Sequence, residues 1–498
     1  MALSPKKIYE DLKRNSIDKS AAVDLLIFLI GNDNSLEIRL ESIRTLQKIK
    51  VSNEKVFSVL EDLLVSDSNE EIRELAANSL KELFQEKALS PLKWALEHEN
   101  SLQVLMSIIK NIKKINNHNT KSIFIDAVGK FDIDKFSNSI RALYINKEIQ
   151  SFKTSKLAKI IKNYTIIKYF EEILKEVDYQ IEKGLVAELN LSFASNEIHG
   201  WKILNNLSQY LNDLEDLKRL ELRSDRIGKF PNSISSLYSL QFLDLSHNSI
   251  AKIPDSIQSL KSLEYLNLEY NDLTEIPKSI GSLTSLKELN LKHNKLTNLT
   301  PNLGKLTSLK VINLHGNQFN MFPPVLEDLS SLEILKLGLN NLRSVPAWVK
   351  NLHSLKILEL GGNKSLSNFE DWIDFLPSVV ELNLYNDDIR ELPESIGTLN
   401  SLEVLILPNN KITKLPESFR KLTSLKKVDL SWNDVTNVPE WISSLSSLEE
   451  LNLRGNQLES LPDTISSLPS LKILTITQNK NIIQIPKDLQ NRGIEINK

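Results

Sequence analysis

The residue types that most often carry out chemistry are scarce in this chain. Its 498 residues include seven histidines and no cysteine. His293 and His315 lie on neighbouring predicted strands, and Glu269 lies on the strand before them. Because adjacent strands lie about 4.8 Å apart, two imidazoles and a carboxylate could meet there as metal ligands. Polar lining of a binding face is the simpler interpretation, and we predict no metal site.

Motifs for catalysis or nucleotide binding are absent from the sequence. The lack of cysteine excludes thiol catalysis, iron–sulfur clusters and disulfides. Gly304-Lys305 is followed by Leu306 and has no glycine five residues earlier, so it is not a P-loop. GxSxG, HExxH and GxGxxG do not occur. We therefore expect a protein that is not an enzyme and needs no cofactor.

Asparagine, by contrast, recurs at a strict spacing from residue 225 onward. The step is 23 residues, except for 24 between Asn363 and Asp387. A side-chain amide can both donate hydrogen bonds to the backbone and accept them from it. Stacked amides would satisfy turns that are otherwise buried, so we predict a structural ladder. Its asparagines are Asn248, Asn271, Asn294, Asn317, Asn340, Asn363, Asn410, Asn433, Asn456 and Asn479, with Asp225 and Asp387 as variants.

The residues around each asparagine predict the elements that position it. Between Leu240 and Leu263, apolar Leu243 and Leu245 alternate with outward-facing residues, a period of two that is typical of a short strand. Pro254 opens the return segment, because proline lacks the N–H that a strand ladder needs. A single unit of this size cannot bury its own apolar face, but a stack of units can.

This pattern, LxxLxLxxNxLxxLPxxIxxLxSL, resembles the leucine-rich repeat, in the 23-residue intracellular class of Ras-suppressor, Shoc and Scribble-type scaffolds. The resemblance covers roughly residues 186–498. It implies an α/β solenoid: a horseshoe with a parallel concave sheet, built over residues 185–498 from about twelve repeats plus degenerate caps. It also implies a non-catalytic scaffold in signal transduction, with a small GTPase or a phosphatase as the partner.

Residues 1–184 show a different and weaker repeat, at an offset of 34 residues. Ile38-Arg39, Ile43 and Leu46 match Ile72-Arg73, Ala77 and Leu80, and Asp33 and Asp67 precede the two copies. This resembles the HEAT repeat, in which such aspartates and arginines form interhelical contacts. We therefore predict an α-helical HEAT-like domain, although a miscellaneous helical bundle would fit as well. Its last helix is expected at 166–183, with Thr165 as cap and Gly184 as stop.

Charge is uneven in this helical part. Residues 101–170 carry 13 basic and 4 acidic side chains, a net charge of +9, whereas the whole chain has a net charge of −3. A basic surface of this kind could bind nucleic acid or an anionic membrane. A solvated helix face is the alternative that we favour.

The outward positions of the predicted strands provide the candidate binding face. Apolar and aromatic side chains stand there without being needed for the core, although β-branched residues also favour strands. The predicted partner-binding residues are Phe242, Tyr265, Tyr270, Val311, Ile334, Leu339, Ile357, Val404, Ile406 and Trp432. Gly316, Gly338, Gly361 and Gly362 are expected to leave room for the partner. Trp348, Trp372 and Trp441, on the return segments, are expected to pack between repeats.

Composition agrees with a folded protein. Hydrophobic residues make up 41% and charged residues 25% of the chain, values typical of globular domains. The amino-terminal residues lack the apolar core of a signal peptide, so we expect a cytoplasmic location.

Overall fold

The computed structural model describes residues 3–115, 117–174, 177–194, 204, 206–366, 372–376, 378–479, 485–490 and 492–497. It divides into two compact units, Met1–Leu189 and Asn190–Lys498, and each is described by itself. The division lies a few residues after the boundary that we propose between residues 184 and 185.

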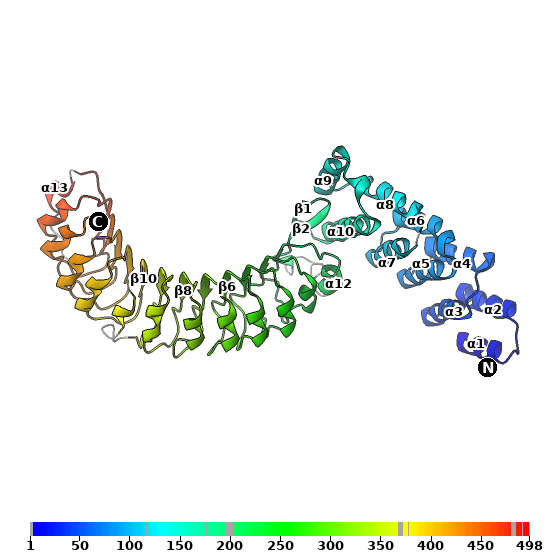
Figure 1. The fold of residues 1–498 in the computed structure, drawn as a ribbon, viewed down its shortest axis with the longest axis horizontal. Coiled ribbons are helices and arrows are strands. Elements are labelled where there is room, and N and C mark those ends of the chain that lie inside the picture. The colour runs from blue at the N-terminus through cyan, green and yellow to red at the C-terminus, as the bar shows by residue number, and fades with distance from the viewer. Residues whose placement is uncertain are drawn as a thin grey trace. The chain divides into compact units, whose positions relative to one another are not determined.

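The first unit consists of successive helices that pack side by side (Figure 1). Ser4, Asp18, Ser35, Asn53, Asn69 and Ser101 cap six of these helices with side-chain oxygens. The helices are α1 (Pro5–Lys13), α2 (Lys19–Asn32), α3 (Leu36–Ile49), α4 (Glu54–Ser66), α5 (Glu70–Phe84), α6 (Leu89–His98), α7 (Leu102–Lys114), α8 (Asn119–Val128), α9 (Asp134–Ile145) and α10 (Thr154–Ile173).

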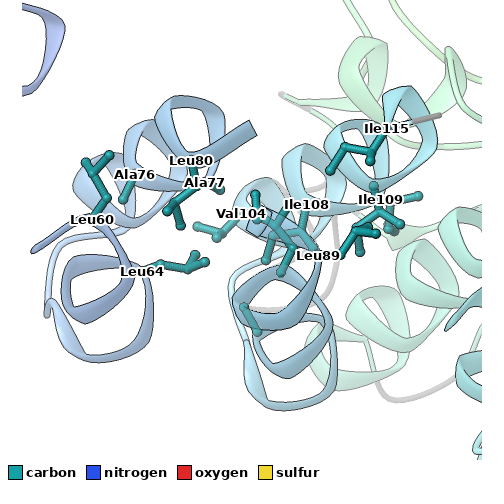
Figure 2. Close-up of a cluster of buried hydrophobic side chains, with 14 of the residues drawn as sticks. Leu60, Leu64, Ala76, Ala77, Leu80, Leu89, Val104, Ile108, Ile109 and Ile115 are labelled. Atoms are coloured by element: carbon teal, nitrogen blue, oxygen red, sulfur yellow. The ribbon is translucent and has the colours of Figure 1, made fainter. Parts of the chain in front are cut away.

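The weak sequence repeat marks the buried faces of these helices. Ile43 and Leu46 of α3, and Ala77 and Leu80 of α5, are fully buried. Figure 2 shows how the core continues along the unit, with Leu80 of α5 and Val104, Ile108 and Ile109 of α7 among its members. Each helix pair thus buries its apolar face against the next pair, as expected for HEAT-like packing.

Arginines join successive repeats of the helical unit. Arg39 of α3 pairs with Asp67, which follows α4, and its Nε donates to the Ile30 carbonyl at 2.8 Å. Arg73 of α5 donates to both carboxylate oxygens of Glu99, at 2.8 and 2.9 Å. The sequence prediction identified the two arginines but missed Glu99, which replaces aspartate in the third copy.

The prediction for the end of this unit was wrong. Helix α10 already ends at Ile173, and Thr165 lies inside it, where its hydroxyl donates to the Ile161 carbonyl. A hairpin follows, formed by β1 (Asp178–Glu182) and β2 (Leu185–Asn190). Lys183 and Gly184 have φ values of +49° and +79°, the left-handed backbone of a two-residue hairpin turn. Gly184 therefore closes a hairpin and does not stop a helix.

The second unit is a solenoid of parallel strands, which Figure 1 shows on the inner side of an arc. Each strand pairs in register with the next, as Phe242 does with Tyr265. Two short helices, α12 (Leu207–Leu211) and α13 (Lys487–Gln490), lie near its ends. The strands are β3 (Arg219–Glu221), β4 (Phe242–Asp244), β5 (Tyr265–Asn267), β6 (Glu288–Asn290), β7 (Val311–Asn313), β8 (Ile334–Lys336), β9 (Ile357–Glu359), β10 (Glu381–Asn383), β11 (Val404–Ile406), β12 (Lys427–Asp429), β13 (Glu450–Asn452), β14 (Ile473–Thr475) and β15 (Glu495–Asn497).

Proline and leucine determine the outer side of the arc. Pro254 adopts φ −75° immediately before a short 3₁₀ turn, Asp255–Ser259, and the same arrangement follows most strands. Ile257, Leu260 and Leu263 of this turn and its exit are buried against Leu243 and its equivalents. The return segment that the sequence predicts after Pro254 is therefore a single 3₁₀ turn.

The asparagine ladder satisfies the backbone at the carboxyl end of the strands. In the repeat of Asn340, the side-chain Oδ1 accepts from the Phe319 N–H at 3.0 Å. Its Nδ2 lies 3.0 to 3.1 Å from the carbonyls of Leu314, Leu337 and Gly338. One buried amide thus connects its own turn to the turn of the preceding repeat, and the other ladder asparagines make the corresponding bonds.

Asp387 occupies a ladder position with a group that cannot donate when it is ionised. Its Oδ1 accepts from the Asn363 N–H, whereas its buried Oδ2 has no hydrogen-bond partner among the described residues. Burial raises the pKa of Asp387 to about 7. A protonated carboxyl has one donor, so it is the closest equivalent of the amide that other repeats use.

We predict that Asn340→Ala will destabilise the array by about 1–3 kcal/mol, because the buried Phe319 N–H loses its acceptor. The carbonyls of Leu314, Leu337 and Gly338 each lose one donor and keep another. Urea unfolding and hydrogen exchange measure the loss, which should be greatest near Phe319 and Asn340 because repeats interact mainly with their neighbours. Asn341→Ala, at the adjacent exposed asparagine, is the matched control. Equal stability of the two variants would contradict the ladder.

We predict that Asp387→Asn will raise the melting temperature more at pH 8 than at pH 5. The folded-state pKa, about 7, exceeds the unfolded value of about 3.9, so wild-type stability falls as the pH rises from about 4 to about 7. The full penalty at pH 8 is at most about 4 kcal/mol. Asp388→Asn is the control, since that exposed carboxylate pairs with Lys411 at 2.6 Å; its removal should give no such gain.

Candidate functional site on the concave face

The strands present a row of half-buried apolar side chains on their inner face. Val311, Ile334 and Ile357 are direct neighbours in register on β7, β8 and β9. Val404 and Ile406, on β11, are also half-buried and lie on the same face, beyond Glu381 of β10. Five of the predicted partner-binding residues thus stand on one surface.

An aromatic stack occupies the amino-terminal strands of this face. The rings of Phe242 and Tyr265 are parallel, with centroids 4.2 Å apart. The guanidinium of Arg219 lies 3.5 Å from the centroid of the Phe242 ring and pairs with Glu221 at 2.7 Å. Burial raises the pKa of Tyr265 to about 12, which keeps its hydroxyl a hydrogen-bond donor at neutral pH.

The residue immediately before each ladder position has a left-handed backbone. Glycine or asparagine adopts this conformation at little cost, and Gly316, Gly362, Asn386, Asn409 and Gly455 do so here. Tyr270, Leu339 and Trp432 occupy the same position with φ values of +51°, +47° and +57°. Their exposed fractions are 43%, 40% and 47%. Large, partly exposed side chains therefore occupy backbone positions that do not favour them.

The expectation that glycines leave room for a partner was wrong, because side chains of neighbouring repeats fill that room. A β-carbon on Gly316 would lie 2.3 Å from Nδ1 of His293, and one on Gly362 would lie 2.5 Å from Leu339. A β-carbon on Gly361 would similarly meet the Tyr385 ring at 2.2 Å. Gly338 is likewise enclosed, by the Gly361 carbonyl and His315. The absence of a side chain at these glycines leaves room for rings and other side chains of neighbouring repeats.

A second polar ladder lies within the strands, and the sequence prediction missed it. Asp244, expected to point outward, is buried: one of its carboxylate oxygens accepts from the Ser246 N–H at 2.8 Å, and the other accepts from Asn267 at 3.1 Å. Asn267 in turn accepts from the Glu269 N–H. The asparagine and aspartate that recur four residues before the ladder are the signal that could have revealed it.

The histidines on this face belong to hydrogen-bond and ring networks. His315 Nδ1 lies 2.7 Å from Glu359, which also pairs with Lys336 at 3.6 Å. Burial opposes ionisation of Glu359, but the hydrogen bond from His315 holds the pKa of Glu359 below its usual value. Glu269 pairs with Lys292 and not with His293. Within the described ranges, no three metal-ligating side chains converge.

The tryptophans of the outer side pack between repeats. Trp372 is buried. Trp348 and Trp441 are half-buried and contact Phe322 and Phe419 of the preceding repeats, with ring centroids 6.1 and 6.2 Å apart. These ring contacts join neighbouring repeats, as the sequence predicts for tryptophans of the return segments.

Many cations of the basic segment, residues 101–170, already have partners inside the helical unit. Lys130 pairs with Glu97 at 2.9 Å and Lys168 with Asp132 at 3.2 Å. Lys121 donates to the Gln150 carbonyl, and Lys156 lies over the Phe152 ring. These contacts reduce the charge that the segment can offer to phosphates. Among the residues that the structure describes, no helix is long and apolar enough to cross a bilayer.

Comparison with known proteins agrees with this geometry. A family model described as a leucine-rich repeat region matches residues 201–384 and 376–480. The chain belongs to the leucine-rich-repeat family. HEAT repeats match residues 8–81 of the helical unit. Leucine-rich-repeat proteins typically mediate protein–protein interactions, and neither repeat family is generally catalytic.

Solved structures similar to this leucine-rich-repeat protein include bacterial and plant examples. A leucine-rich-repeat protein of Leptospira interrogans is 32% identical, over 59% of this chain and 86% of that one, with a TM-score of 0.44. An internalin of Listeria monocytogenes is 20% identical, over 58% and 88%, with a TM-score of 0.44. The ectodomain of the Arabidopsis receptor kinase HAESA is 24% identical, over 64% and 67%, with a TM-score of 0.41. The search of curated proteins finds no match.

We predict that Gly316→Ala will destabilise the leucine-rich repeats by about 1–3 kcal/mol, since φ is +67° there and the new β-carbon would collide with the His293 ring. Chemical denaturation measures the change. Gly228→Ala is the matched control, because nothing lies within 4 Å of a β-carbon at Gly228. If both variants lost the same stability, the proposed seating of His293 would be wrong.

Proposed function

We propose that this protein is a non-catalytic scaffold that binds a protein partner on the concave face of its leucine-rich repeats. The observation that carries the proposal is the exposure of Tyr270, Leu339 and Trp432 at left-handed backbone positions. Backbone preference does not account for these residue types, since asparagine or glycine adopts the left-handed conformation at less cost. Exposed aromatic and aliphatic anchors are the usual centres of protein interfaces.

The apolar row extends this anchor set across the sheet. Val311, Ile334 and Ile357 offer apolar contact area on adjacent strands. The complete proposed binding surface consists of Phe242, Tyr265, Tyr270, Val311, Ile334, Leu339, Ile357, Val404, Ile406 and Trp432. A row of anchors in a polar surround is the arrangement that protein interfaces favour.

The resemblance to Ras-suppressor, Shoc and Scribble-type scaffolds supports a finer proposal. We infer that the partner belongs to small-GTPase signalling, either a GTPase or a phosphatase bound beside one, in the cytoplasm. This step rests on family analogy and not on a residue of the site. Purified small GTPases, loaded with GDP or with a GTP analogue, are the first proteins to test.

The left-handed positions allow a test that separates binding from folding. The double variant Leu339→Asn/Trp432→Asn puts asparagine at both left-handed positions. Asparagine already occupies the equivalent positions of other repeats, at Asn386 and Asn409. We expect the double variant to remain folded and to lose at least about tenfold in partner affinity, because hot-spot side chains are removed. Affinity capture with mass spectrometry, followed by calorimetry on the purified partner, measures the loss.

Two controls accompany this test. Tyr238→Asn replaces an exposed aromatic that lies outside the strands, and this variant should bind normally. Captures at about 50 and 200 mM salt reveal any nucleic acid or anionic lipid, whose binding would fall steeply with salt. Partner capture that survives the double variant unchanged would show that the concave face is not the binding surface.

A further inference from the structure

Charged side chains interrupt the apolar row of the concave face, and several of them are paired. The row runs through the first residue of each strand. Arg219 pairs with Glu221 at 2.7 Å, and Lys427 pairs with Glu450 at 2.7 Å. Glu288 and Glu381 differ from these residues, because neither has an ion-pair partner among the described residues.

Both unpaired carboxylates lie between apolar neighbours. Glu288 of β6 stands in register with Tyr265 on one side and Val311 on the other. Glu381 of β10 stands likewise between Ile357 and Val404. Both glutamates are half-buried. An ionised carboxylate in such surroundings loses hydration without gaining a counter-charge, so a cation from outside would stabilise it.

Lys336 only partly offsets the loss of hydration at Glu288. Burial raises the pKa of Glu288, and Lys336 is the one charge that opposes this rise. Lys336 already pairs with Glu359 at 3.6 Å. The array therefore compensates the charge of Glu288 only in part.

The strand register fixes the distance between the two carboxylates. Four strand steps separate β6 from β10, which at about 4.8 Å each gives about 19 Å. Val311, Ile334 and Ile357 fill the positions between them. An extended peptide advances about 3.3 Å per residue, so about six residues span the same distance. Side chains alternate between the two faces of an extended chain, so two side chains six residues apart lie on the same face.

The apolar row is narrow, and its width favours an extended partner segment over a helix. On one side it is bordered by Asn313, Lys336 and Glu359 of the same strands. On the other side, Glu333 pairs with Lys310 at 2.8 Å and with Lys356 at 3.2 Å. The row is therefore one side chain wide. One face of an extended segment has that width, whereas the apolar stripe of a helix is broader.

We propose that the concave face binds an extended basic–apolar segment of its partner, with two Lys or Arg side chains six residues apart that pair with Glu288 and Glu381. Apolar side chains at the second and fourth positions after the first cation contact Val311, Ile334 and Ile357. The proposal rests on the proposed function of this face and specifies the chemistry of the partner.

Immobilised peptides test the proposal with the full chain as the soluble probe. Each peptide carries two lysines separated by four to eight residues, with Ile or Val at alternate positions between them, and a matched set carries glutamates in place of the lysines. We expect binding to peak at a separation of six and to weaken with added salt. Glu288→Gln combined with Glu381→Gln should weaken it by about 3- to 10-fold per charge.

Two further variants complete the experiment. One reverses the two charges, and the other removes a carboxylate that is already paired. Glu288→Lys combined with Glu381→Lys should transfer the preference to the glutamate peptides. Glu450→Gln, at the carboxylate of the same row that pairs with Lys427, should leave binding unchanged. Melting temperatures establish that every variant is folded.

Three results would overturn the proposal. Binding that ignores lysine spacing but is lost in the Leu339→Asn/Trp432→Asn variant would refute the charge spacing and leave the concave-face function intact. A helical peptide series that binds best, with lysines about 11 or 14 residues apart on one face, would refute the extended form. Absence of binding to every peptide would refute this occupant, and partner capture would then assess the proposed function on its own.

Discussion

A buried side-chain amide at the end of each short strand is the interaction on which the repeat array depends. A strand of three residues makes few ladder hydrogen bonds, and the chain must turn immediately afterwards towards the outer side of the arc. The turn brings backbone groups into the interior, where unpaired donors and acceptors are costly. Asn340 satisfies four such groups from two repeats. Aspartate at position 387 has the same shape but lacks the donor, and its burial raises the pKa of the carboxyl to about 7.

The ladder also determines the surface that faces a partner. Every residue before a ladder position takes a left-handed backbone, so its side chain stands at the edge of the concave sheet. In several repeats that residue is glycine or asparagine, as backbone preference alone would select. In the repeats of Tyr270, Leu339 and Trp432, large side chains stand there. The structural device that stacks the repeats therefore also provides the positions from which the most exposed anchors project.

Charge is used differently in the two units. In the helical unit, arginine–carboxylate pairs such as Arg73 with Glu99 connect successive repeats and are largely buried. On the concave face, Lys427–Glu450 and His315–Glu359 also connect strands. Glu288 and Glu381 are exceptions to this internal pairing, and their apolar neighbours give them the character of binding groups. Charges that remain unpaired inside an apolar row are thus more informative about recognition than the net charge of any segment.

The sequence by itself determined the repeat, its 23-residue period, the ladder and the alternation of the strands, because these follow from local spacing and from the need to bury one apolar face per unit. It also gave the arginines of the helical repeats. Only the tertiary structure decided what occupies the space beside the glycines, which carboxylates have counter-ions, and that Asp244 is buried. It also showed that Thr165 lies inside a helix and that Gly184 closes a hairpin. In the repeat array such outcomes depend on side chains of adjacent repeats, as Asn267 bonds to Asp244 and His293 fills the space beside Gly316, and the spacing of residues within one repeat does not specify them.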